Sequence, residues 1–181
     1  TELYVGEINV LGNNTVGPVY VELGSLNFPG NNTFTDKLRL AGGVVTLGGT
    51  NTIGGVVNMT EGELALTTSN SFGANGFSLN LGNGVLSLRD TTQTLREITT
   101  GTRGEIRNGG NSSATVIFNI DREQIVNSAL NDGDGVGSLN VTKTGPGVLR
   151  LGSADSNFTG VLRVEEGVVA VNSADFAGSP S

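Results

Sequence analysis

Two groups of carboxylates lie close enough together in the sequence to suggest acid–base chemistry. Glu165 and Glu166 are adjacent and follow Asp155 by ten residues, and the second group is Asp121-Arg122-Glu123. Enzymes that cleave polysaccharides use clustered carboxylates, often beside Arg or Lys. Binding of a sugar would also favour stacking aromatic rings, yet the chain has no Trp. We therefore expect no catalytic residue, and a polysaccharide-binding or polysaccharide-cleaving protein is the alternative function.

A second candidate site is a short run of oxygen-bearing side chains. The run Asn131-Asp132-Gly133-Asp134-Gly135 looks like the start of a calcium-binding loop, because calcium prefers several closely spaced oxygen ligands. The two positions that follow, where further ligands should stand, hold Val136 and Gly137. The sequence therefore favours a solvated loop, and we expect no metal ion and no cofactor.

Composition removes several other kinds of chemistry. The chain has no His, the commonest general base and transition-metal ligand, and no Cys for a thiolate or a disulfide. Its net charge is −7, and its ten Lys and Arg residues are scattered. Nucleic acid is therefore not an expected partner. No apolar run approaches the ~20 residues of a membrane helix, so we expect no membrane insertion by this segment.

The elements that would position these side chains come from an internal repeat of about 20 residues. Its main phrase is two short alternating apolar runs joined by a glycine, as in Leu38–Leu47 and Val57–Leu66. The spacings between the central glycines are 18, 19, 19, 22, 20, 43 and 20 residues. In this register Thr60-Glu61 stands where Glu165-Glu166 does, and such variation indicates an exposed turn. The central glycines are Gly6, Gly24, Gly43, Gly62, Gly84, Gly104, Gly147 and Gly167.

A second phrase separates the copies of the first. It is a polar run with Asn or Asp, a Ser or Thr, and one apolar residue, as in Gly30–Thr35 and Gly49–Gly54. Asn, Asp and Gly tolerate left-handed backbone conformations, so we expect corners whose apolar residue points inward. A column of corner hydroxyls would suit ice binding, but corners are curved and we do not favour that role. The hydroxyl positions are Thr15, Thr33, Thr52, Ser71 and Thr159.

Together the two phrases predict an all-β fold, a single-stranded parallel β-helix, or β-solenoid, over residues 1–181. Each unit has one apolar face that it can bury only by stacking on its neighbours. About nine coils at ~4.8 Å each would make a rod roughly 40 Å long. An antiparallel sandwich also has short strands at this spacing, but it does not explain why both phrases recur in phase.

The doubled spacing between Gly104 and Gly147 predicts an irregular coil or insertion at residues 109–138. Within it, Val116, Phe118 and Ile120 alternate as in a strand, and residues 122–130 suit a short helix or an irregular excursion. Irregular insertions carry function more often than regular repeats do. A lateral ligand is therefore expected here, if anywhere.

One stretch of the chain resembles a known family. Leu139–Leu151 contains Lys143, Gly145 and Gly147 in a Leu-x-Val-x-Lys-x-Gly-x-Gly pattern, and an Asn157-Phe158 corner and the pair around Gly167 follow. This stretch is similar to the β-strand repeat of bacterial autotransporter passenger domains. The resemblance implies a right-handed parallel β-helix, secretion and exposure at the cell surface.

We therefore expect a non-catalytic structural or adhesive segment of a secreted bacterial surface protein. The chain opens inside the motif at Leu3 and stops at the corner Asn172–Gly178, so neither end looks capped. Unpaired strand edges are templates for another chain. The expected partners are a second copy stacked head to tail in a filament, a longer parent chain of which this is a stalk or adhesin segment, and a host or matrix surface ligand.

Overall fold

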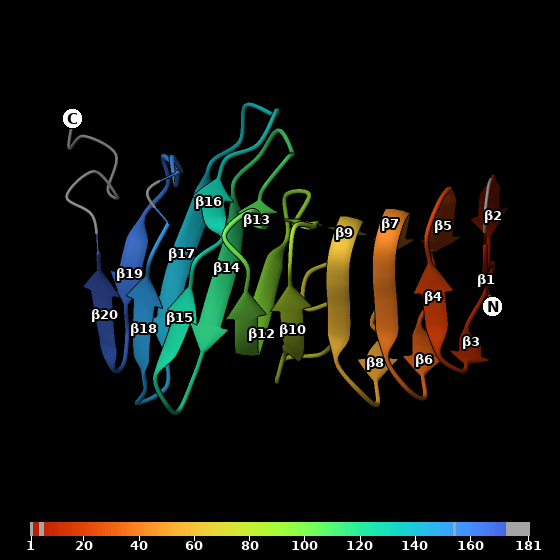
Figure 1. The fold of residues 1–181 in the computed structure, drawn as a ribbon, viewed down its shortest axis with the longest axis horizontal. Helices are drawn as coiled ribbons and strands as arrows, with labels where there is room; N and C mark the ends of the chain where they lie inside the picture. The colour runs from red at the N-terminus through yellow and green to blue at the C-terminus, as the bar shows by residue number, and fades with distance from the viewer. Residues whose placement is uncertain (1, 4–5, 154, 173–181) are drawn as a thin grey trace.

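The computed structural model describes residues 2–3, 6–153 and 155–172. Within these ranges the chain has no helix and forms a β-solenoid of about eight turns (Figure 1). The predicted solenoid is confirmed, and the antiparallel sandwich is excluded because the described strands pair in parallel throughout. The same ranges contain no helix long and apolar enough to cross a membrane.

One face of the solenoid is a sheet that extends along the stacked turns. Its strands follow the order β1-β4-β7-β9-β10-β12-β14-β17-β19, so neighbours in the sheet come from successive turns. They are β1 (Glu2–Leu3), β4 (Val19–Val21), β7 (Leu38–Leu47), β9 (Val57–Leu66), β10 (Phe77–Leu81), β12 (Thr92–Thr100), β14 (Ala114–Asn119), β17 (Leu139–Thr144) and β19 (Leu162–Val164).

A second row of strands follows a corner in the successive turns from β2 to β16. β7 and β9 pass round this corner unbroken, with register shifts at Leu40/Ala41 and Ala41/Val44, and their C-terminal halves belong to the second row. The other members are β2 (Glu7–Asn9), β5 (Ser25–Phe28), β11 (Val85–Ser87), β13 (Glu105–Arg107) and β16 (Ala129–Asn131).

Two short stacks complete the structure, one near each end. The stack near the N-terminus is β3-β6-β8, and the stack near the C-terminus is β15-β18-β20. Their strands are β3 (Asn14–Val16), β6 (Asn32–Phe34), β8 (Thr52–Ile53), β15 (Gln124–Val126), β18 (Val148–Leu151) and β20 (Val168–Val171).

Inward-pointing apolar side chains form columns because residues in the same phase of the repeat are paired across turns. In the second row, six residues from six successive turns are in register and each is at most 9% exposed. Such a column keeps water away from the backbone hydrogen bonds of every turn that it crosses. These residues are Leu26, Val45, Leu64, Leu86, Ile106 and Leu130.

The central glycines of the repeat stack at the corner between the first and second rows. Gly43 and Gly62 both have positive φ, of 66° and 84°. A Cβ atom on Gly43 would lie 2.5 Å from the carbonyl oxygen of Gly24, and one on Gly62 would lie 2.6 Å from that of Gly42. The glycine repeat therefore reflects both a left-handed turn and close contact between successive turns.

Buried amide side chains connect the turns at the β3-β6-β8 corner. Asn32 and Asn51 are 2% and 0% exposed. The backbone amide of Asn14 donates to Asn32 Oδ1 at 3.2 Å, and that of Asn32 donates to Asn51 Oδ1 at 3.0 Å. These bonds satisfy backbone donors that would otherwise be buried without a partner.

The predicted irregular stretch at residues 109–138 contains three strands and no helix. Val116, Phe118 and Ile120 are buried, as their alternation predicted. The short helix considered for residues 122–130 is wrong, because this segment forms β15 and β16. Pairing between turns overrides any local helical preference here, since β16 continues the second row beside β13.

Candidate functional site

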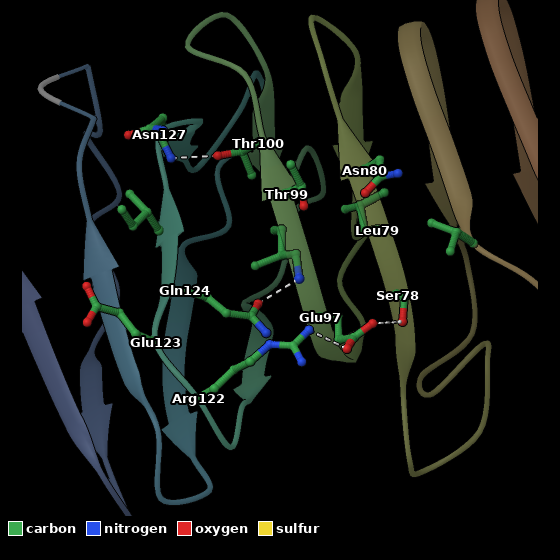
Figure 2. A pocket seen from close by; sticks show the side chains of 13 residues that line it. Ser78, Leu79, Asn80, Glu97, Thr99, Thr100, Arg122, Glu123, Gln124 and Asn127 are labelled. Atoms are coloured by element: carbon green, nitrogen blue, oxygen red, sulfur yellow. Dashed lines mark hydrogen bonds and ion pairs between the residues drawn. The ribbon is translucent and has the colours of Figure 1, made fainter.

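Beyond Leu95, β12 no longer pairs with β14. A groove lies there, between the C-terminal part of β12 and β15 (Figure 2). The N-terminal part of β12 pairs with β14, ending at Leu95 and Phe118. The C-terminal part of β12 pairs on its other side with β10. β15 lies beside this C-terminal part but belongs to the separate β15-β18-β20 sheet.

Two side chains connect β12 with β15, which are not paired with each other through backbone hydrogen bonds. The amide of Ile98 donates to Gln124 Oε1 at 2.7 Å, and the amide of Asn127 donates to Thr100 Oγ1 at 2.6 Å. Gln124 is only 7% exposed. Side-chain oxygens therefore accept the backbone hydrogen bonds that a paired strand accepts elsewhere in the sheet.

Replacing Gln124 is expected to weaken the contact between β12 and β15. Gln124→Leu should lower the free energy of unfolding by about 2 kcal/mol, because the Ile98 amide is left without an acceptor. The measurement is denaturant unfolding, with hydrogen exchange of the Ile98 amide as a local readout. Glu123→Leu is the control; it removes only an exposed ion pair and should change stability by at most about 0.5 kcal/mol. Equal effects of the two substitutions would contradict the bridging role.

Ion pairs lie along the groove. Arg122 Nη2 is 2.7 Å from Glu97 Oε1, and Ser78 Oγ donates to Glu97 Oε2 at 3.2 Å. Glu123 Oε1 is 2.5 Å from Arg150 Nε. These carboxylates are therefore engaged with guanidinium groups in this structure.

The groove has a volume of about 430 Å³, within the range of small-ligand sites. A neighbouring hollow of about 380 Å³ shares Ser78 and Glu97 with it, and another of about 430 Å³ shares Asn80, Thr99 and Thr100. The three hollows therefore form one depression across β9, β10, β12, β14 and β15. The main groove is lined by Val56, Ser78, Leu79, Asn80, Glu97, Ile98, Thr99, Thr100, Arg122, Glu123, Gln124, Ile125 and Asn127.

The structure separates the carboxylates of the Asp121-Arg122-Glu123 group. Arg122 and Glu123 line the main groove, whereas Asp121 lines the neighbouring hollow with Arg96 and Asn119. Glu97, which sequence reasoning did not single out, lines both hollows. Two signals in the sequence pointed to this region, the interrupted glycine spacing and the Asp121-Arg122-Glu123 group.

The Glu165–Glu166 pair lies in an exposed turn on the last described turn of the solenoid. Glu165 Oε1 is 3.2 Å from Arg163 Nε. Asp155 is exposed in the corner before β19, where its amide donates to Ser153 Oγ at 3.3 Å. None of the three residues lines the hollows described above.

The carboxylate of Asp132, in the candidate calcium loop, already accepts hydrogen bonds from the protein. Its carboxylate accepts from the Leu139 amide at 2.7 Å and from Thr159 Oγ1 at 2.7 Å. Asp134 Oδ2 lies 3.4 Å from Arg107 Nη1. Among the residues described, no three His, Cys, Asp or Glu side chains gather as a metal site would require.

The corner hydroxyls form only a short column. Thr15, Thr33 and Thr52 are exposed and paired in register across β3, β6 and β8. Ser71 is 0% exposed, and Thr159 donates to Asp132. The column of exposed hydroxyls therefore spans only three turns. Its surface is small for binding a ligand such as ice.

Lys143 is a buried cation outside the groove. It is 0% exposed, and its Nζ donates to the carbonyls of Thr144 and Gly145 at 2.6 Å each and to that of Glu166 at 3.3 Å. Burial lowers its pKa below the ordinary value of 10.5, while the nearby Glu166 carboxylate raises the pKa and opposes the shift. The ammonium group thus joins the turns of two successive coils.

Comparison of the chain with protein-family models, curated proteins and solved structures found no match. Its function is therefore argued from the geometry and from the sequence pattern.

Proposed function

We propose that this chain is a non-catalytic structural and adhesive segment of a secreted bacterial surface protein, of the kind found in autotransporter passengers. The observation that carries the proposal is the parallel stacking of about eight successive turns. A rod of this kind needs no ligand, metal or catalytic centre for its stability, and each added coil lengthens it. The motif around Lys143, Gly145 and Gly147 supports the passenger assignment.

The last described turn offers a surface for a further coil. β20 pairs only with β18 among the described strands. Val164, Val168 and Val171 on this turn are 48%, 53% and 43% exposed. Another copy of the chain, or a longer parent protein, would cover these side chains and pair with the open edge.

Negative-stain electron microscopy at several protein concentrations, with long incubation, tests the stacking role. Fibres of uniform width would establish a self-stacking subunit, whereas rods of roughly 40 Å that never elongate would establish a stalk segment. Compact particles without a long axis would contradict both roles, and release of reducing ends from polysaccharides would contradict a non-catalytic role.

A pair of variants tests whether fibres form through the exposed turn. Val168→Asp should abolish fibres, because a carboxylate would be buried between stacked copies. Val136→Asp is the control, since Val136 is 89% exposed in a lateral loop. Fibres that persist in the Val168 variant would show that assembly uses another surface.

A further inference from the structure

We infer that the groove between β12 and β15 binds a segment of a neutral polysaccharide. This inference rests on the proposed adhesive function and names the class of ligand that the chain would bind. It does not depend on the ends of the solenoid stacking, because the groove lies on a lateral face. The polarity, the charge balance and the extent of the groove all favour this ligand.

The polar lining matches a ligand that carries many hydroxyl groups. Asn80 and Thr99 are exposed and paired in register on β10 and β12, and both line the groove (Figure 2). Neither side chain has a partner elsewhere in the described part of the chain. Amide and hydroxyl groups both donate and accept hydrogen bonds, as sugar hydroxyls do. Two such groups side by side therefore suit neighbouring hydroxyls of one sugar unit.

The charges beside the groove compensate one another. Arg122 is paired with Glu97, and Arg150 is paired with Glu123. The neighbouring hollow adds one further charge of each sign, Arg96 and Asp121. The depression therefore carries no excess charge that would select a phosphate, a sulfate or a uronate, and a neutral ligand fits it best.

The depression is longer than a single small ligand requires. Its three hollows share residues and cross five strands of the solenoid. A site of this extent contacts several units of a chain at once. This favours a polymer over a monosaccharide.

No aromatic ring lines the groove, so affinity must come from hydrogen bonds. Each such bond replaces one made to water and contributes little net free energy. We therefore expect dissociation constants of about 1 mM for a single segment. Repeated sites along a polymer raise the apparent affinity, which makes an immobilised polymer the appropriate probe.

The test is affinity electrophoresis of the full chain in native gels that contain a soluble polysaccharide. The neutral probes are a mixed-linkage β-glucan, dextran, galactomannan, arabinoxylan and a galactan, and the anionic probes are polygalacturonate and heparin. At least one neutral polymer should retard the wild-type chain. Asn80→Ala combined with Thr99→Ala should weaken retardation about tenfold.

The matched control is Thr115→Ala combined with Thr142→Ala. Both threonines are half-buried on β14 and β17 of the same sheet, and neither lines the three hollows. This variant should be retarded like the wild type. The inference is overturned if no neutral polymer retards the chain, if both double variants behave alike, or if only anionic polymers retard it. None of these outcomes bears on fibre formation, so the stacking proposal is tested separately.

Discussion

Replacing Gly62 by alanine is expected to lower the free energy of unfolding by about 4 kcal/mol. Two costs add together in this substitution. The φ of 84° is strained for any residue with a Cβ atom. In addition, the new Cβ would lie 2.6 Å from the carbonyl oxygen of Gly42 and 2.7 Å from that of Gly43. The backbone of one turn must therefore move away from the next, which weakens the hydrogen bonds that join them.

Gly73 provides a control that separates the two costs. Its φ is 77°, but a Cβ atom there would meet nothing within 4 Å. Gly73→Ala should therefore cost only the conformational strain, about 1 kcal/mol. Denaturant unfolding of both variants measures the difference. Similar losses would mean that close stacking of the glycines contributes little, and that the repeat requires glycine for its backbone conformation alone.

The stacked fold was predictable because its signal is periodic. Gly24, Gly43 and Gly62 recur at the spacing of one turn, and each meets the same obstacle, the backbone of the turn before it. Leu64 and Leu86 likewise occupy the same phase of the repeat and are paired in the structure. Periodicity in sequence becomes contact in space when every unit stacks on an equivalent unit.

The groove was not predictable in detail because its side-chain contacts join turns whose length departs from the regular repeat. Glu97 and Arg122 are 25 residues apart, and Ile98 and Gln124 are 26 apart. Both separations exceed the 18- and 19-residue spacings of the first repeats. The turns in this part of the chain are longer, since β13 pairs with β16 at an offset of 24 residues and β14 pairs with β17 at an offset of 25. The interrupted spacing between Gly104 and Gly147 indicated where the irregularity lies. It carried no information on which side chains would face each other.

Lys143 shows a different limit of sequence reasoning. The resemblance to the autotransporter repeat includes Lys143 as one position of its pattern and implies no role for it. A charged residue is ordinarily exposed, although its alternation with Leu139 and Val141 places Lys143 on the inward face of β17. The sequence does not show which acceptors would satisfy its buried ammonium group. Its environment depends on the carbonyl of Glu166, which belongs to the next turn of the solenoid.

Replacing Lys143 by methionine is expected to lower the free energy of unfolding by about 3 kcal/mol at neutral pH. Methionine has a similar length but donates no hydrogen bond. The carbonyls of Gly145 and Glu166 would lose the donor that they have at 2.6 Å and 3.3 Å. The carbonyl of Thr144 would keep a bond from the Ile120 amide at 3.2 Å, so it contributes less to the loss. Lys37→Met is the control, because Lys37 is exposed.

The cost of burying the charged ammonium group opposes this stabilisation. The dependence of the free energy of unfolding on pH reports that cost separately. Because burial lowers the pKa of Lys143 in the folded chain below 10.5, the unfolded chain binds more protons between that lowered pKa and 10.5. The free energy of unfolding should therefore rise with pH across this interval. The rise should be present in the wild type and in Lys37→Met, and absent in Lys143→Met. If Lys143→Met were as stable as the wild type at neutral pH, the desolvation cost would equal the gain from the carbonyls, and Lys143 would not stabilise the stacking of the last two turns.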